Sequence, residues 1–181
     1  MKIESRLLVL RKYNIVNSYL ISVFKEFQRY ETFGRKTMEQ LSDKDLFHQP
    51  AEEVNSIAVI VKHLHGNMIS RWTDFMTEDG EKEWRDRAGE FEDTLKTREE
   101  IYELWTQGWN LVFDALEKLR EPELENKVII RGEEHTVIAA TNRQLCHYAY
   151  HVGQMVLIGK MLLGEKWDSL STPKGKSLIR R

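Results

Sequence analysis

The sequence contains few of the residues that mark secreted or membrane proteins. Among its 181 residues are one cysteine and three prolines. A single cysteine cannot form an intramolecular disulfide, which is compatible with a reducing compartment, and we expect a cytoplasmic protein. No apolar run approaches the roughly 20 residues that a membrane-spanning helix needs. Charged residues interrupt the apolar residues of the N-terminus, unlike those of a signal peptide, and we expect no membrane partner.

The sequence also lacks a large net charge and the motifs of two broad enzyme classes. The formal net charge is -2, and the basic run at residues 174–181 is only a short tail. We therefore expect no nucleic-acid partner, since a protein that binds nucleic acid needs a basic surface. Neither a G-x-S-x-G motif nor a glycine-rich phosphate loop is present, so acyl-enzyme chemistry and nucleotide binding have no support.

What the sequence does contain is four long segments with the apolar period of an amphipathic helix. They cover about residues 5–30, 56–75, 98–119 and 137–163. After Phe33-Gly34 we expect the first helix to be followed by a separate, shorter helical piece that ends at Leu41. Capping residues support the starts of the later helices: Asn55 or Ser56, Thr97, and Thr136 or Val137.

These segments predict an all-α fold, because each apolar stripe must be buried against the others. We expect a four-helix bundle in a single domain of residues 1–181, with the bundle at about 5–163 and a C-terminal tail at 164–181. β-branched residues on both sides of Gly132 predict a small hairpin before the last helix.

The longest non-periodic stretch is residues 77–96, which carries mixed charge around Trp84 and Phe91. Loops of this length in compact domains often cover a functional site. We hypothesise that this stretch covers one, in which case Trp84→Ala should change ligand affinity or activity.

Candidate chemistry centres on the run NRQLCHYAYHVGQ, residues 142–154, which holds His147 and His151. Side chains four residues apart leave a helix on the same face, about 6 Å apart along the axis. The two imidazoles could therefore hold one metal ion. The same spacing also occurs in polar residues on a helix flank, so the prediction of a metal site needs a third ligand.

His63 is the best candidate for that third ligand. It lies at the edge of the apolar stripe of the second helix, whereas His65, two residues on, points the other way. His63, His147 and His151 would line one end of the bundle as a three-ligand site with an open coordination position, as in catalytic zinc sites.

Imidazole ligands suit zinc, nickel, iron or copper. We expect a divalent metal ion, zinc or nickel first, that lowers the pKa of a bound thiol or water. Polar neighbours are candidates for orienting the ligands: Asn67, Gln144, Tyr148 and Gln154.

At two of these segments the chain resembles the DinB-like superfamily, which includes bacillithiol and mycothiol S-transferase-like proteins. The segments are SIAVIVKHL, ending with His63-Leu64, and HYAYHVGQ, from His147 to Gln154. The family pattern is a His-Leu or His-Ile on the second helix and H-x-x-x-H followed by Gly-Gln on the last. The resemblance covers nearly the whole chain and is closest to an uncharacterised Bacillus-type branch.

The resemblance implies a metal-binding four-helix bundle, often a homodimer, with a divalent metal on the three histidines. It also implies a small-molecule substrate, such as a low-molecular-weight thiol, and no DNA binding. Our first interpretation is a metal-dependent enzyme, either thiol S-transferase-like or hydrolase-like. Two alternatives stay open: a non-enzymatic metal- or ligand-binding stress-response module, and a packed bundle whose histidines hold no metal.

Overall fold

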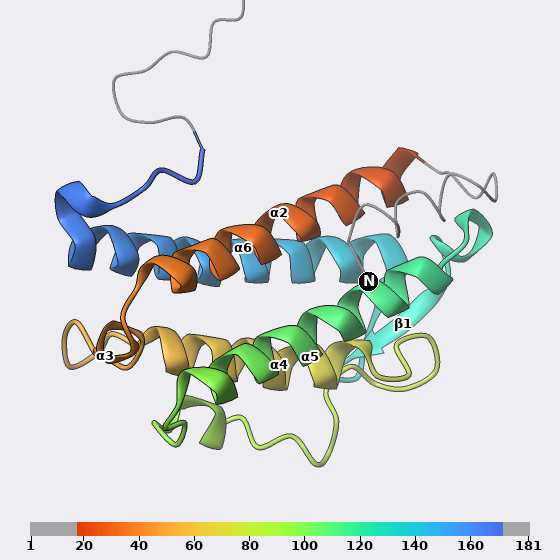
Figure 1. Cartoon of the computed structure of the whole chain (residues 1–181). Helices are drawn as coiled ribbons and strands as arrows, with labels where there is room; N and C mark the ends of the chain where they lie inside the picture. Colours follow the sequence, from red (N-terminus) through yellow and green to blue (C-terminus); the bar gives the residue numbers. More distant parts are fainter. Residues whose placement is uncertain (1–17, 172–181) are drawn as a thin grey trace, which may run out of the picture.

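The computed structural model describes residues 18–171, and its architecture is an all-α bundle (Figure 1). Helix α2 lies against α6 and α4 lies against α5, so the bundle has two layers. Its four long helices are α2 (Ser18–Gln40), α4 (Ile57–Trp72), α5 (Arg98–Lys118) and α6 (Val137–Leu163). The shorter elements are α3 (Asp43–Leu46), β1 (Lys127–Ile130), β2 (Glu133–Thr136), and the 3-10 turns η1 (Gly89–Phe91), η2 (Glu121–Glu123) and η3 (Gly164–Lys166).

Side-chain caps begin three of the long helices where the sequence predicts them. The Ser56 hydroxyl accepts a hydrogen bond from the Val59 amide at the start of α4. Thr97 and Glu100 form a reciprocal capping box at the start of α5. These caps satisfy amide groups that have no partner within the helix, and they fix where each helix begins. The predicted hairpin is also present, with β1 and β2 paired antiparallel immediately before α6.

The prediction for the first helix was wrong at Gly34. Helix α2 continues through this residue to Gln40 without a break. The glycine is needed for space, because a Cβ at this position would overlap the buried ring of Trp105 on α5. Residues 5–17 of the predicted helix and residues 172–181 of the predicted tail lie outside the described residues.

The direction of the helices explains the long connection between α4 and α5. Both helices start at the α3 end of the bundle and run toward the hairpin end, so residues 73–97 return along its length (Figure 1). Their path brings η1 against α4. Residues far from α4 in sequence are thereby placed beside its middle turns.

One aromatic residue from each long helix meets at the centre of the core. The buried rings of Phe27, Trp72, Trp109 and Tyr148 contact one another with centroid separations of 5.5–6.2 Å. Trp72 Nε1 donates a hydrogen bond of 2.9 Å to the Tyr148 hydroxyl, so that hydroxyl is occupied in the core. Because Tyr148 faces inward, the rotation of α6 about its axis is set, and with it the direction of the neighbouring histidines.

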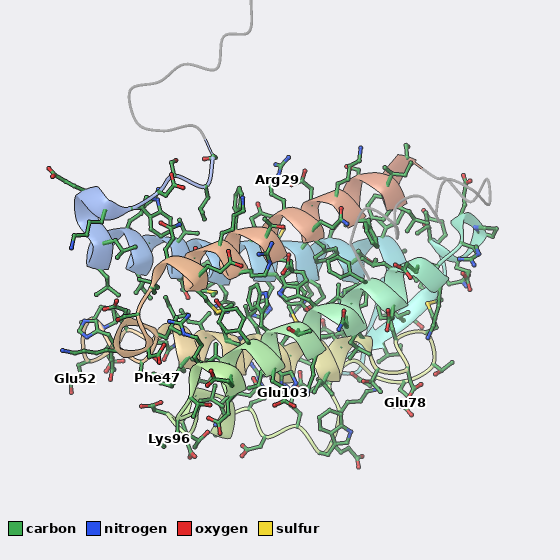
Figure 2. The ribbon with its side chains drawn as sticks, in the orientation of Figure 1. Arg29, Phe47, Glu52, Glu78, Lys96 and Glu103 are labelled. Atoms are coloured by element: carbon green, nitrogen blue, oxygen red, sulfur yellow. The ribbon has the colours of Figure 1, made fainter. Side chains whose placement is uncertain are left out.

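Charged side chains lie around the outside of the bundle, as the labelled Arg29, Glu78 and Glu103 illustrate (Figure 2). No helix among the described residues combines the length and apolarity needed to cross a bilayer.

We expect Gly34→Ala to lower the free energy of unfolding by about 1–3 kcal/mol, because the added methyl group overpacks the Trp105 contact. The matched control is Gly153→Ala on α6, where a Cβ would meet nothing within 4 Å. That change should be neutral or raise stability by up to about 1 kcal/mol through helix propensity. Urea denaturation of both variants tests this, and equal midpoints would contradict the packing role of Gly34.

Candidate metal centre

Three histidine side chains converge between α4 and α6. His147 Nε2 lies 3.3 Å from His63 Nε2 and 3.1 Å from His151 Nε2. One ring nitrogen from each residue fits within a set whose members all lie within 4.8 Å of one another. His63 and His151 are buried and His147 is half-buried. The three residues that the sequence predicts as ligands are therefore brought together.

The helices explain this convergence, and they also correct its predicted place. His147 and His151 leave α6 one turn apart on the same face, and His63 leaves the facing side of α4. His65 points away and bonds to Gln107 on α5, as its position on the helix predicts. The cluster lies near the middle of both helices, and the prediction that it lines one end of the bundle was wrong.

Hydrogen bonds at Nδ1 determine which nitrogens are free to bind a ligand. His63 Nδ1 lies 2.9 Å from Glu90 Oε2, and His151 Nδ1 lies 3.1 Å from Gln154 Oε1. A carboxylate or an amide oxygen only accepts, so both histidines carry their proton on Nδ1. Their Nε2 atoms then present lone pairs to His147 Nε2, which can donate to only one of them. The cluster has more acceptors than donors and calls for a cation.

At neutral pH this cation is not a proton, because His147 and His151 both have lowered pKa values. Burial, followed by the nearby His151 and His63, lowers the pKa of His147 to about 3. Burial, followed by His63, lowers the pKa of His151 to about 4 despite the opposing hydrogen bond to Gln154. Both imidazoles are therefore neutral at pH 7, which is the form that binds a metal ion.

The spacing of the nitrogens fits a metal ion. Two imidazole nitrogens bound to zinc at tetrahedral angles, each about 2.0–2.1 Å from the ion, lie about 3.3–3.4 Å apart. The observed 3.1 and 3.3 Å separations are close to this value. A donor set of three imidazoles suits zinc, nickel and other late divalent metals. The residues present thus fit a divalent ion.

Of the predicted orienting residues, only Gln154 bonds directly to a histidine of the cluster. Asn67 and Gln144 are buried one turn from His63 and His147, respectively, and their amide oxygens have no hydrogen-bond partner. Both line a polar cavity beside the cluster. Tyr148, the remaining candidate, points into the core, where its hydroxyl accepts from Trp72.

Glu90 is the site residue that the sequence prediction missed. Its carboxylate accepts from His63 Nδ1 and, at 2.6 and 2.9 Å, from Nε and Nη2 of Arg85. Burial raises the pKa of the Glu90 carboxyl, but these bonds outweigh that effect and hold it below its ordinary value. The carboxylate stays ionised and completes a carboxylate–histidine pair of the kind that orients metal-binding imidazoles.

One sequence signal for Glu90 existed, in the middle of α4. A Cβ at Gly66 would overlap the Glu90 carboxyl, so a glycine at this position admits the loop to the helix surface. An isolated glycine inside a helical pattern often has a packing reason, although a Cβ at Gly153 would meet nothing within 4 Å. It does not say which residue approaches.

The stretch 77–96 does reach the cluster, but through residues other than Trp84. Phe91 stacks on His63 with a centroid separation of 4.6 Å, and Glu90 bonds to the same ring. Trp84 is 60% exposed and does not contact the cluster, so Trp84→Ala does not test the covering hypothesis. Phe91 is the aromatic residue that tests it.

Two cavities of different character flank the cluster. His63 and His147 line a polar cavity of about 250 Å³ toward the hairpin end of the bundle. His151 lines a largely apolar groove of about 550 Å³ toward the other end. The cluster is therefore accessible to small molecules from two sides.

Fold and site together define an all-α bundle with a candidate three-histidine metal centre. Residues 14–176 match the family model described as "Protein of unknown function (DUF1572)". The match covers most of the chain, and the protein belongs to this family. Comparison with curated proteins and with solved structures gives no match.

We expect Glu90→Gln to weaken binding of a divalent metal by about 10- to 100-fold, because it removes the charge that orients His63. Glu92→Gln is the matched control, since Glu92 is exposed and its side chain has no contact with the cluster. Competition against a chromophoric chelator measures both affinities, with circular dichroism to check folding. Equal affinities in the two variants would contradict the role of Glu90.

The lowered histidine pKa values predict how the stability of the metal-free protein changes with pH. The ordinary value is 6.5, so between pH 6.5 and about 4 the unfolded chain binds more protons than the folded chain. The free energy of unfolding should fall as the pH is lowered through this window and be fully retained above it.

Denaturation of the metal-free protein across this range measures the effect. His147→Gln should make stability less steeply dependent on pH. The matched control replaces a histidine in an exposed loop, His48→Gln. Parallel curves for wild type and His147→Gln would show that His147 titrates normally.

Proposed function

We propose that this protein is a divalent-metal-dependent enzyme of the DinB-like superfamily. Its activity would be thiol S-transferase-like or hydrolase-like. The observation that carries the proposal is the convergence of three imidazoles, two of them oriented at Nδ1 by Glu90 and Gln154. The grouping of this family with the DinB-like families supports the superfamily assignment.

His63, His147 and His151 would hold the metal, with zinc and nickel the first candidates. A divalent ion bound there would lower the pKa of a coordinated thiol or water and so supply a nucleophile at neutral pH. Three protein ligands leave a coordination position for substrate, unlike the four-ligand sites that only stabilise a fold. Phe91 stacks on His63 and excludes water from one face of that ring.

The apolar groove supports a small-molecule substrate. Its wall includes Phe91, Tyr150, Leu157 and Met161, and it opens beside His151 and Gln154. Sites for small molecules are typically concave, mostly apolar and fitted with a few polar groups. A homodimer is part of the same proposal, in which a second copy would close over the exposed outer wall of this groove at Tyr150, Leu157 and Met161.

Elemental mass spectrometry of the untagged protein is the first test. We expect about one divalent ion per chain in the wild type, lost in His63→Ala, His147→Ala and His151→Ala. His65→Ala is the matched control and should keep the metal, because His65 bonds to Gln107 away from the cluster. Absence of metal from the wild type, even after dialysis against zinc and nickel, would refute the proposal.

Activity assays on the metal-loaded protein then separate the two reactions. In thiol transfer, sulfur bonds to an electrophilic carbon, the leaving group departs with the bonding electron pair, and the thiol proton passes to solvent. Hydrolysis instead proceeds without added thiol. Bound metal with neither reaction across both substrate panels would favour the non-enzymatic metal-binding module.

A further inference from the structure

Five arginines surround the polar cavity beside the histidine cluster. They come from four separate segments: α4, the loop of residues 73–97, the turn of the hairpin, and α6. No aspartate or glutamate is among the described residues that line this cavity. We call it the arginine chamber, and its arginines are Arg71, Arg85, Arg87, Arg131 and Arg143.

Ion pairs within the described residues do not neutralise these charges. Arg71 and Arg131 both pair with Glu81, and Arg87 lies 4.0 Å from the same carboxylate. Arg85 pairs mainly with Glu90. Four guanidinium groups thus share two carboxylates, which lie outside the chamber wall.

The fifth, Arg143, has no hydrogen bond or ion pair among the described residues, and it leaves α6 on the turn before His147. Asp79 accepts hydrogen bonds from the amides of Arg131 and Gly132, and this fixes the hairpin turn that presents the Arg131 side chain. The chamber wall therefore carries excess positive charge held by a defined backbone.

Buried polar atoms without partners also line the chamber. Arg71 is 3% exposed, and its Nε atom has no hydrogen-bond partner. The amide oxygens of Asn67 and Gln144, which are 6% and 3% exposed, have none either. A side-chain amide can turn to present its NH2 group, so both residues can serve as donors. Buried polar groups that lack partners are unfavourable, and a ligand in the chamber would satisfy them.

We propose that the arginine chamber binds an oxyanion, a carboxylate or phosphate group of the substrate, next to the metal centre. Planar guanidinium groups match the geometry of these anions and form strong charge-assisted hydrogen bonds with them. Because His63 and His147 form part of the wall, one small molecule can occupy the chamber and reach the histidine cluster. The substrate class is then a small molecule with an anionic group close to its reacting atom.

The identification of the anion as part of the substrate rests on the proposed function. The binding site itself consists of arginines and amides and does not require the metal. His151→Ala allows the two to be separated, because His151 lines the apolar groove rather than the chamber. Anion binding is expected to persist in that variant.

The experiment titrates the full-length protein with inorganic phosphate and, separately, with succinate by calorimetry at low ionic strength, with chloride as reference anion. We expect one of the two probes to bind more tightly than chloride, which identifies the preferred oxyanion. Arg143→Ala and Arg87→Ala should each weaken its affinity roughly tenfold. Both arginines are exposed, so these variants should fold normally.

Arg29→Ala is the matched control, since Arg29 projects from the outer side of α2 (Figure 2). Within residues 18–171 its one ion pair is with Glu26. The affinity of this variant should equal that of the wild type. Wild-type binding no tighter than chloride, affinity unchanged in the Arg87→Ala/Arg143→Ala double variant, or binding lost in His151→Ala would each overturn the inference. Anion binding without metal in the wild type would instead refute only the proposed function.

Discussion

The buried carboxylate of Glu90 joins the long loop, α4 and the histidine cluster. It accepts two hydrogen bonds from Arg85 on its own loop and one from His63 on α4. An ionised carboxylate in this position would be strongly unfavourable without such partners. The loop therefore has one favourable way to lie on α4, and Gly66 leaves the space for it. The orientation of His63, the stacking of Phe91 and the position of Arg85 all follow.

Helix α6 accounts for the different character of the two cavities. The residues of α6 that line the two cavities change from polar at Gln144 and His147 to apolar at Leu157 and Met161, with His151 between them. Residues three and four apart share a face, so this gradient in sequence becomes a gradient along the bundle. The histidine cluster lies where the polar side chains of α6 give way to apolar ones. A ligand bound there would meet guanidinium groups on one side and apolar side chains on the other.

Features of the fold that depend on local chemistry could be predicted. The caps at Ser56 and Thr97 and the hairpin around Gly132 involve residues within a few positions of one another. The prediction that the first helix breaks after Gly34 was wrong, because a glycine can have either of two structural roles. It can end a helix, or it can make room for a neighbour, and only the position of Trp105 on another helix decides which.

By itself, the sequence determined the helices and the three histidines, because helical periodicity is local and places His147, His151 and His63 on inward faces. The tertiary structure decided what surrounds them. Arg71 is far from Arg131 and Arg143 along the chain, and no helical or strand spacing relates the three. Their side chains share one chamber because α6 packs against both α4 and the hairpin. The loop of residues 73–97 adds Arg85 and Arg87 as it returns along the bundle. The path of that loop depends on the packing of every helix, and local pattern does not encode it.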